Sequence, residues 1–403
     1  MEATKQYLPG LTVTTICKNE EENIAGMLAS ALKFADEVII TDTGSTDMTI
    51  PIIQAFIKKH PKRVSLTHRA WDNNFANARN HALPMARYRW LMWMDCDDRV
   101  TVDEQFEKVL GHCRQGKLNP NAVFSFDIVS GAKKDHVFEQ TRIWPNGEKI
   151  HFTGMVHEIL DNGRDLHDKT PVFLDCKIRH LGYNDDEKWK SKVERNYQGL
   201  LEMVKESPDN FRHKFQLANT YLEFSLREDD LTKRQALRNQ TLALYLDVYE
   251  RLEAQDLLRS DLAFGCAHAI GQWYGGLAEN FDMATAWGKE CVQLRSRESL
   301  GYIAVAQGEF CRKNPEEAMR WISMAETKKT GRTMHWMTMD YDSFYASADK
   351  IARACSQLKK IKEQQKKEAG DGIKKFLGAM VSPENPDAEA LNVNLNEGEP
   401  AYA

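Results

Sequence analysis

The chain has 403 residues, of which 42% are hydrophobic and 28% charged, and its formal net charge at pH 7 is −5. This composition excludes a chain that is disordered throughout, and the length favours two or three domains over one small module. The slightly acidic balance gives no overall attraction to nucleic acid or to anionic membranes, so polyanion binding would need a local basic patch.

The eight cysteines include no C-x-x-C pair and no regular spacing, which speaks against a disulfide framework or a structural zinc site. Reduced thiols are typical of the cytosol. The N-terminus lacks the basic start and apolar stretch of a secretory signal, and no apolar run approaches the roughly 20 residues that cross a bilayer. We therefore expect a cytoplasmic protein without a transmembrane segment.

Short β-type runs alternate with helical patterns over the first 180 or so residues. Expected strands are residues 11–17, 37–42, 63–68 and 89–94, and expected helices are residues 22–34, 46–59 and 75–87. Such alternation predicts a parallel sheet covered by helices. From residue 123 to about 181, short extended runs with Pro-Asn-Gly and Asp-Asn-Gly turns predict an appended mixed or antiparallel part.

Beyond residue 185 the pattern is almost wholly helical, and an internal period appears. Asn280, Ala284 and Trp287 recur as Asn314, Ala318 and Trp321, a shift of 34 residues. This is the period of tetratricopeptide (TPR) repeats, with a generic helical array as the alternative. We expect a catalytic domain at 1–185, a helical TPR-like domain at 186–378 and a disordered acidic tail at 379–403.

Carboxylates crowd together in Asp95-Cys96-Asp97-Asp98, directly after the strand expected at 89–94. A divalent cation is the simplest way to keep such neighbours ionised, and Mg²⁺ or Mn²⁺ would link them to phosphate oxygens. The alternative is a solvated acidic turn. Asp42 ends the second strand, and Asn19 and Glu20 follow the first. The alternative is that Asn19 and Glu20 begin the next helix and that Ser45, Thr46 or Asp47 caps the helix after Asp42. Ligands of open α/β sheets bind at this edge.

Several motifs together resemble family 2 glycosyltransferases of the GT-A fold. They are K-N-E at 18–20, T-D-T-G-S-T-D at 41–47, F-A-N-A-R-N at 75–80, W-M-D-C-D-D at 93–98, G-M-V-H-E at 154–158 and H-L-G-Y at 180–183. The resemblance covers roughly residues 10–185. It implies the fold class α/β, a GT-A (nucleotide-diphospho-sugar transferase) domain followed by an all-α helical-repeat domain.

The resemblance also implies roles for single residues in donor and metal binding. Glu20 and Asp42 would contact the nucleoside, and Arg79 would lie near the phosphates or the sugar. Asp95 and Asp97 would act on the ribose and diphosphate through the cation, with His180 as third metal ligand. A structural salt bridge is the alternative for Arg79, and a buried structural histidine for His180.

Family members of this kind usually invert the anomeric centre, which requires a general base. We expect Glu158 to be that base, with His157 as orienter or alternate base and Asp98 in reserve. A purely structural loop is the alternative for His157 and Glu158. The Q-x-x-R-W segment and E-D pair of other family members are missing from the second half of the catalytic region. Most tryptophans should belong to the core, with Trp144 as the expected substrate contact.

The leading hypothesis is therefore a metal-dependent hexosyl- or pentosyltransferase that uses a nucleotide-sugar donor, with a uridine diphosphate sugar as the default. The acceptor would be large: a glycan or lipid-core precursor, a protein, or hydroxymethylated cytosine in phage DNA. A peripheral partner could bind the helical repeats. Two alternatives remain: a non-catalytic TPR-type interaction protein with a relic GT-A domain, and a sugar nucleotidyltransferase. Phosphate-loop, dinucleotide-binding, zinc-helix and serine-hydrolase motifs are missing from the sequence.

Overall fold

The computed structural model describes residues 6–130, 136–147, 149–163, 166, 168–182, 186–328, 347–357 and 360. The expected tail at 379–403 and Tyr183 of the H-L-G-Y motif lie outside these residues. The chain divides into two compact units, residues 1–207 and residues 208–403. The boundary expected after residue 185 stays a prediction, and the helix that follows it belongs to the first unit.

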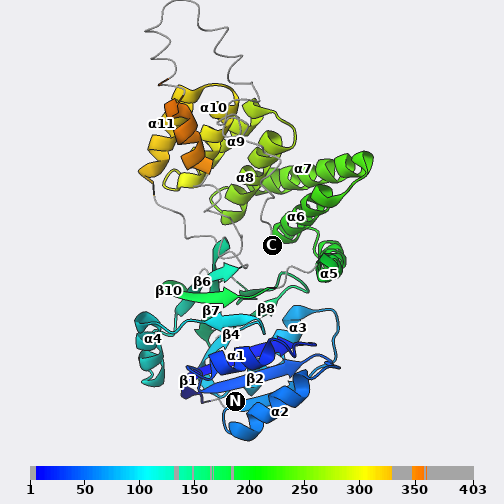
Figure 1. The fold of residues 1–403 in the computed structure, drawn as a ribbon, viewed down its shortest axis with the longest axis vertical. Coiled ribbons are helices and arrows are strands. Elements are labelled where there is room, and N and C mark those ends of the chain that lie inside the picture. The colour runs from blue at the N-terminus through cyan, green and yellow to red at the C-terminus, as the bar shows by residue number, and fades with distance from the viewer. Residues whose placement is uncertain are drawn as a thin grey trace, which may run out of the picture. The chain divides into compact units, whose positions relative to one another are not determined.

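An eight-stranded sheet forms the frame of the first unit, in the order β3-β2-β1-β4-β7-β6-β10-β5 (Figure 1). Its parallel half consists of β1 (Leu8–Cys17), β2 (Glu37–Asp42), β3 (Val64–His68) and β4 (Tyr88–Trp93). The connecting helices are α1 (Ile24–Ala31), α2 (Thr49–Lys59) and α3 (Phe75–Asn80). The predicted alternation of strands and helices is confirmed.

One predicted helix is shorter than expected. The pattern predicted residues 75–87, whereas α3 ends at Asn80 and a 3₁₀ turn, η1 (Leu83–Met85), follows it. Pro84 lies in that turn. A proline has no N–H group to donate and disfavours helical geometry in the residue before it, so the helix stops early.

The other half of the sheet is mixed, as predicted. It contains β5 (Asp98–Val100), β6 (Ala122–Ser130), β7 (His136–Pro145) and β10 (Thr170–His180), with α4 (Glu104–Arg114) between β5 and β6. β7 is antiparallel to β4 and β6, while β10 is parallel to β6 and antiparallel to β5. β8 (His151–Thr153) and β9 (Ile159–Asp161) form a separate two-stranded sheet.

Alternate residues of the strands enter two different apolar clusters. Val38 and Ile40 pack in the larger one with residues of α1 and α4, whereas Ile39 between them packs in the other. Because side chains alternate across a strand, both faces of the sheet are covered. Trp144 is fully buried in the second cluster, where it contacts the edge of Phe152. The expectation that Trp144 contacts substrate is therefore wrong.

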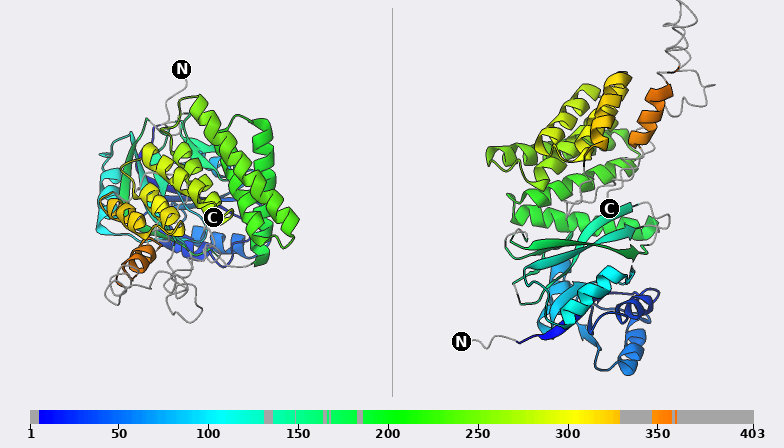
Figure 2. Two further views of the ribbon diagram at one scale, coloured as in Figure 1. Left: turned by 90° about the horizontal axis from the view of Figure 1, so that it is seen from above. Right: turned by 90° about the vertical axis from the view of Figure 1, so that its left-hand side faces the viewer.

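Helix α5 (Asp186–Glu206) completes the first unit, and successive helices make up the second (Figure 2). The second unit contains α6 (Phe211–Arg227), α7 (Leu231–Ala254), α8 (Asp261–Gly276), α9 (Phe281–Leu294), α10 (Ser299–Cys311) and α11 (Pro315–Glu326). Each packs against the next. Residues 347–357 are helical as well.

The 34-residue period corresponds to a structural repeat. Asn280 precedes α9 and Asn314 precedes α11, so the two aligned segments are equivalent helices in successive pairs. Small residues allow these helices to pack closely: a Cβ added to Gly288 would lie 2.9 Å from the backbone nitrogen of Val305. This arrangement confirms the TPR-like repeats.

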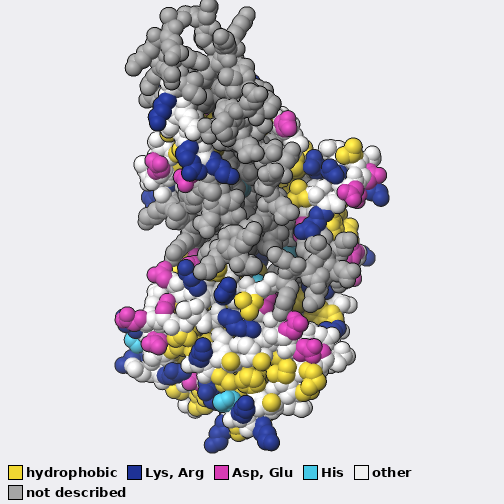
Figure 3. Space-filling model, in the orientation of Figure 1, with side chains coloured by type: hydrophobic (Ala, Val, Ile, Leu, Met, Phe, Trp, Pro, Cys, Tyr) yellow, Lys and Arg dark blue, Asp and Glu magenta, His cyan; other side chains and the backbone are white. Residues whose placement is uncertain are grey.

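On the face drawn in Figure 3, the first unit carries Lys and Arg interspersed with Asp and Glu, with hydrophobic side chains between them. Among the described residues, no helix combines the length and the apolar character that crossing a membrane would need. The cytoplasmic location stays a prediction.

Candidate active site

The parallel strands β1, β2 and β4 end at the same edge of the sheet, and each is followed by predicted site residues. Cys17 at the end of β1 pairs with Asp42 at the end of β2. On the other side of β1, the backbone N–H of Met94 donates to Thr14 (3.0 Å), which aligns the acidic turn after β4 with this edge. The order of the strands therefore places the turns that follow them next to one another.

Asp42 is buried at the end of β2 and organises its own turn. Its carboxylate accepts the backbone N–H groups of Gly44 (3.0 Å) and Ser45 (3.2 Å), and His68 lies 3.6 Å away. Burial alone would raise the pKa of Asp42, but the hydrogen bonds from Ser45 and Gly44 bring it below its usual value. Gly44 has a φ of +108°, which permits this tight approach.

Glu20 is half-buried in the loop between β1 and α1. Its backbone N–H donates to the hydroxyl of Thr49 at 2.7 Å, and its carboxylate accepts the side-chain amide of Asn23 at 2.9 Å. Glu20 and Asp42 thus occupy neighbouring loops. Both are fixed by contacts within these loops, and their predicted contact with a nucleoside stays a prediction.

The turn after β4 is closed by Asp98. The backbone N–H of Asp95 donates to Oδ2 of Asp98 (2.9 Å), and the backbone N–H of Asp98 donates to the carbonyl of Asp95 (3.1 Å). β5 begins at Asp98 and pairs with β10 so that His180 lies directly opposite Asp98. The backbone N–H of Leu181 donates to the carbonyl of Asp97 (3.0 Å), which joins β10 to the same turn.

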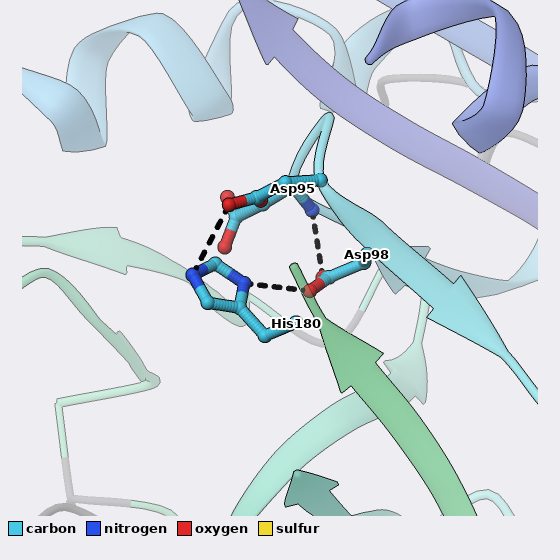
Figure 4. Close-up of side chains that lie close together, drawn as sticks. Asp95, Asp98 and His180 are labelled. Carbon is cyan, nitrogen blue, oxygen red and sulfur yellow. Dashed lines mark hydrogen bonds and ion pairs between the residues drawn. The ribbon is translucent and has the colours of Figure 1, made fainter. Parts of the chain in front are cut away.

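His180 lies between two of these carboxylates (Figure 4). Its Nδ1 is 3.0 Å from Oδ1 of Asp98, and its Nε2 is 3.2 Å from Oδ2 of Asp97. Together with Asp95 they form a group whose potential ligand atoms all lie within 4.8 Å of one another. The structure thus brings together all the residues predicted to bind metal.

Electrostatics at this group favour a cation. Burial, together with the neighbouring charges of Asp95 and Asp98, raises the pKa of Asp97 to about 6. Asp95 differs because Arg79, Arg142 and His180 outweigh its burial and hold its pKa well below the usual value. Carboxylate oxygens and an imidazole nitrogen are suitable ligands for Mg²⁺ or Mn²⁺, so the residues present fit a divalent ion.

Arg79 links the acidic turn to the predicted base. From α3 its Nη2 donates to Asp95 (2.8 Å) and its Nε donates to Glu158 (2.6 Å). The Arg79 side chain is 7% exposed, and its guanidinium carbon lies 4.4 Å from the ring centre of Trp93. Its Nη1 is buried and makes no hydrogen bond within the described part of the chain. Arg79 therefore forms the salt bridges that we considered as its alternative role, and they lie inside the site.

The loop between β8 and β9 carries Glu158 and His157. Two of its residues have left-handed backbone conformations, Gly154 (φ +99°) and His157 (φ +50°). Helix α5 packs on this loop, where a Cβ added to Gly199 would lie 3.0 Å from Val156. Glu158 is 13% exposed and paired with Arg79, whereas His157 is exposed. The structure thus places Glu158 in contact with the acidic turn through Arg79.

Asp98, which we expected as the reserve general base, is fully buried. Its side chain has no exposed surface, and both its oxygens accept hydrogen bonds or ion pairs from Asp95, Arg142 and His180. A general base must reach the proton that it removes from the acceptor. The burial of Asp98 therefore favours a role in positioning its neighbours over the role of reserve base.

Sequence reasoning missed Arg142. This residue of β7 is 2% exposed, its Nη1 lies 2.9 Å from Oδ2 of Asp98, and its guanidinium stacks 3.6 Å from the ring centre of Trp93. The available signal was an arginine directly before the apolar run I-W-P in the strand segment T-R-I-W-P. A buried charge is rare without a partner, so its partner had to be another buried group.

The sequence model of glycosyl transferase family 2 matches residues 12–161. A prophage-derived glycosyltransferase of Bacillus subtilis, SunS, is 28% identical over 218 residues, which is 51% of this chain and 48% of the relative. A TPR repeat-containing protein of Synechococcus elongatus is 26% identical over 215 residues, 50% of this chain and 49% of the relative. The chain thus spans about half the length of these curated relatives.

Among solved structures, residues 1–349 of S. aureus TarS in complex with UDP are 15% identical to the chain. The match covers 72% of this chain and 92% of that one, with a TM-score of 0.38.

Proposed function

Because residues 12–161 are a glycosyl transferase family 2 domain, we propose that this chain transfers a sugar from a nucleotide-sugar donor to a nucleophilic acceptor. One observation carries the proposal. Asp95, Asp97, Asp98 and His180 come within 4.8 Å of one another at the carboxyl edge of parallel strands, where α/β proteins bind nucleotides.

Asp95, Asp97 and His180 would hold a divalent cation, Mn²⁺ or Mg²⁺. When bound, the cation neutralises the charge that develops on the departing diphosphate. Asp98 would not need to be a ligand, because its oxygens already accept from Arg142, His180 and the backbone of Asp95.

On the donor side, Asp42 and Glu20 would bind the nucleoside from the loops after β2 and β1. Arg79 would approach the phosphates or the sugar with its buried Nη1, the nitrogen that has no partner within the described part of the chain. A uridine diphosphate sugar is the proposed donor class.

Glu158 would be the general base. Arg79 binds its Oε1, which fixes the carboxylate and leaves Oε2 for the acceptor. In a direct displacement, Glu158 takes the proton of the acceptor as its oxygen bonds to the anomeric carbon. The bond from that carbon to the diphosphate breaks, and the nucleoside diphosphate leaves with the electron pair. The configuration at the anomeric carbon is inverted.

We propose a large acceptor, a protein, a glycan precursor or modified DNA, because helical repeats such as those of the second unit provide extended binding surfaces. The names of two relatives, a glycosyltransferase and a TPR repeat-containing protein, agree with a transferase domain and helical repeats in one chain.

The first test is a panel of sugar nucleotides, each added with and without Mn²⁺, in a thermal-shift measurement. We expect one donor to raise the melting temperature only when the metal is present, and we expect slow hydrolysis of that donor to release a nucleoside diphosphate. Asp97→Asn should abolish both effects. The matched control is Asp256→Asn, which changes an exposed carboxylate of the second unit and should alter neither.

Each of the other functions predicts a different product. If the protein is supplied with a sugar 1-phosphate and a nucleoside triphosphate instead, release of pyrophosphate would show a nucleotidyltransferase. No stabilisation by any donor and no turnover, in a folded protein, would contradict the enzyme and favour a non-catalytic interaction protein.

A further inference from the structure

The candidate site contains a buried cation that no motif predicted, Arg142. It occupies an irregular point of β7: Phe124 and Ser125 are consecutive in β6, but their partners in β7 are Ile143 and Thr141. Arg142 is therefore the extra residue of a β-bulge. Bulges redirect side chains, and they are frequent next to active sites.

The bulge directs Arg142 beneath the acidic turn. Nη1 of Arg142 lies 2.9 Å from Oδ2 of Asp98, and the two side chains are 2% and 0% exposed. The ring of Trp93, 3.6 Å from the guanidinium carbon, covers one face of the cation. Because both side chains are buried, water does not screen the attraction between Arg142 and Asp98.

Three donors converge on the carboxylate of Asp98. Oδ2 receives Arg142 and the backbone N–H of Asp95, and Oδ1 is 3.0 Å from Nδ1 of His180. These contacts occupy both oxygens of Asp98, and Nδ1 is the ring nitrogen of His180 that faces this carboxyl group. As the donor of this hydrogen bond, Nδ1 would carry a hydrogen.

This hydrogen bond determines how His180 meets the rest of the cluster. With Nδ1 directed at Asp98, Nε2 is directed at Asp97, 3.2 Å away. The second nitrogen of a metal-binding histidine is commonly held by a carboxylate, which fixes the orientation of the ring. Arg142 contacts the carboxylate of Asp98, so it affects His180 through Asp98.

We propose that Arg142 is a positioning residue of this site. Acting through Asp98, it keeps Nε2 of His180 directed at the cation-binding side of the cluster and keeps the backbone of Asp95 in the turn. The part of this inference that concerns a cation rests on the proposed function, whereas the orientation of His180 does not.

The test compares Arg142→Met, Arg142→Lys and a control, Arg63→Met. Arg63 donates to the backbone carbonyls of Leu32 and Ala35 and makes no contact with the acidic turn, so its loss should affect stability alone. ¹⁵N NMR of the metal-free protein reports which ring nitrogen of His180 carries hydrogen, with the signal assigned through His180→Gln. Electron paramagnetic resonance measures the affinity for Mn²⁺.

We expect Arg142→Met to lose the Nδ1–H signature of His180 and to bind Mn²⁺ about 10–100-fold more weakly. In the NMR signal of His180 and in Mn²⁺ affinity, Arg142→Lys should lie between Arg142→Met and the wild type. Arg63→Met should match the wild type in both measurements. A folded Arg142→Met protein with wild-type values in both would overturn the proposal. If Arg142→Met does not fold, wild-type values in Arg142→Lys overturn it, because a lysine cannot reproduce the stacked guanidinium.

A wild-type protein that binds no Mn²⁺ would contradict the proposed function. The NMR comparison would still decide whether Arg142 positions His180.

Discussion

Arg79 and Glu158 are 79 residues apart in the sequence, yet their side chains form a hydrogen bond of 2.6 Å. Arg79 also donates to Asp95. One buried guanidinium thus holds a proposed donor-binding carboxylate and the proposed base at a fixed separation, and the first prediction concerns this bridge.

Replacing Arg79 with methionine should lower kcat by at least about 100-fold, since it leaves two carboxylates without their shared partner. Arg79→Lys keeps the charge but cannot make both contacts with the same geometry, so its loss should be smaller. Steady-state kinetics with the identified donor measure this. Arg320→Met, at an exposed salt bridge of α11, is the control and should be near the wild type. Equal kcat values for Arg79→Met and Arg320→Met would contradict the proposed role of these Arg79 salt bridges in catalysis.

The second prediction concerns the proposed base. Glu158→Gln keeps the shape of the side chain and removes its ability to accept a proton. We expect kcat to fall by about 10²–10⁴-fold, with donor affinity changed little. Single-turnover transfer measures the chemical step, and calorimetry measures donor binding. If His157→Ala is the more damaging of the two substitutions, His157 is the base.

Metal affinity should depend on pH through Asp97. Its pKa is raised to about 6, so below this pH the carboxyl group is protonated and cannot bind a cation. Affinity for Mn²⁺ should therefore fall as the pH decreases through 6. Protonation of His180, whose pKa is raised, despite its burial, by Asp98 and the other carboxylates, should add to this fall. A titration between pH 5 and 8, monitored by electron paramagnetic resonance, gives the midpoint. An affinity that is constant over this range would exclude Asp97 as a ligand.

The stability of the second unit should decrease in mild acid because of His268. Burial lowers the pKa of this residue of α8 to about 4, while an unfolded histidine titrates near 6.5. The unfolded state therefore binds a proton first. Stability is fully present above pH 6.5 and is lost as the pH falls from 6.5 to 4, by about 3 kcal/mol. Calorimetric melting at pH 7 and 5 should show a smaller acid shift for His268→Gln than for the wild type.

Substitution by alanine should affect the stability of the second unit differently at two of its helical glycines. Gly288→Ala places a methyl group 2.9 Å from the backbone nitrogen of Val305, so it should destabilise the unit by about 1–3 kcal/mol. Gly276→Ala meets no atom within 4 Å and should be neutral or stabilising by about 0.5–1 kcal/mol. Thermal melting of the two variants tests the close packing of α9 and α10, and equal melting temperatures would contradict it.

Local patterns were sufficient for the first half of the sheet. The strand predicted at 37–42 coincides with β2, because every residue there is buried and the run is bounded by turn residues. The residues placed at the strand ends were also predicted, since parallel strands bring their carboxyl ends to one edge. The TPR-like period was visible because equivalent helix contacts require similar residues at equal spacing.

Long-range pairing could not be predicted in the same way. His180 faces Asp98 because β10 and β5 are antiparallel neighbours, although β10 is parallel to β6 on its other side. Trp144 was expected to contact substrate because it lies beside the Pro-Asn-Gly turn, whereas its register opposite Leu91 places it in the core.

The amino-acid sequence by itself determined the kind of chemistry: carboxylates after buried strands, in an order that fits a nucleotide-sugar site, followed by a helical repeat. Only the tertiary structure decided which of these groups act on one another. It placed Arg142 beneath Asp98 and Arg79 between Asp95 and Glu158. The physical reason is that a buried charge must find an opposite charge, while the strand register that supplies the partner depends on contacts spread over the whole sheet.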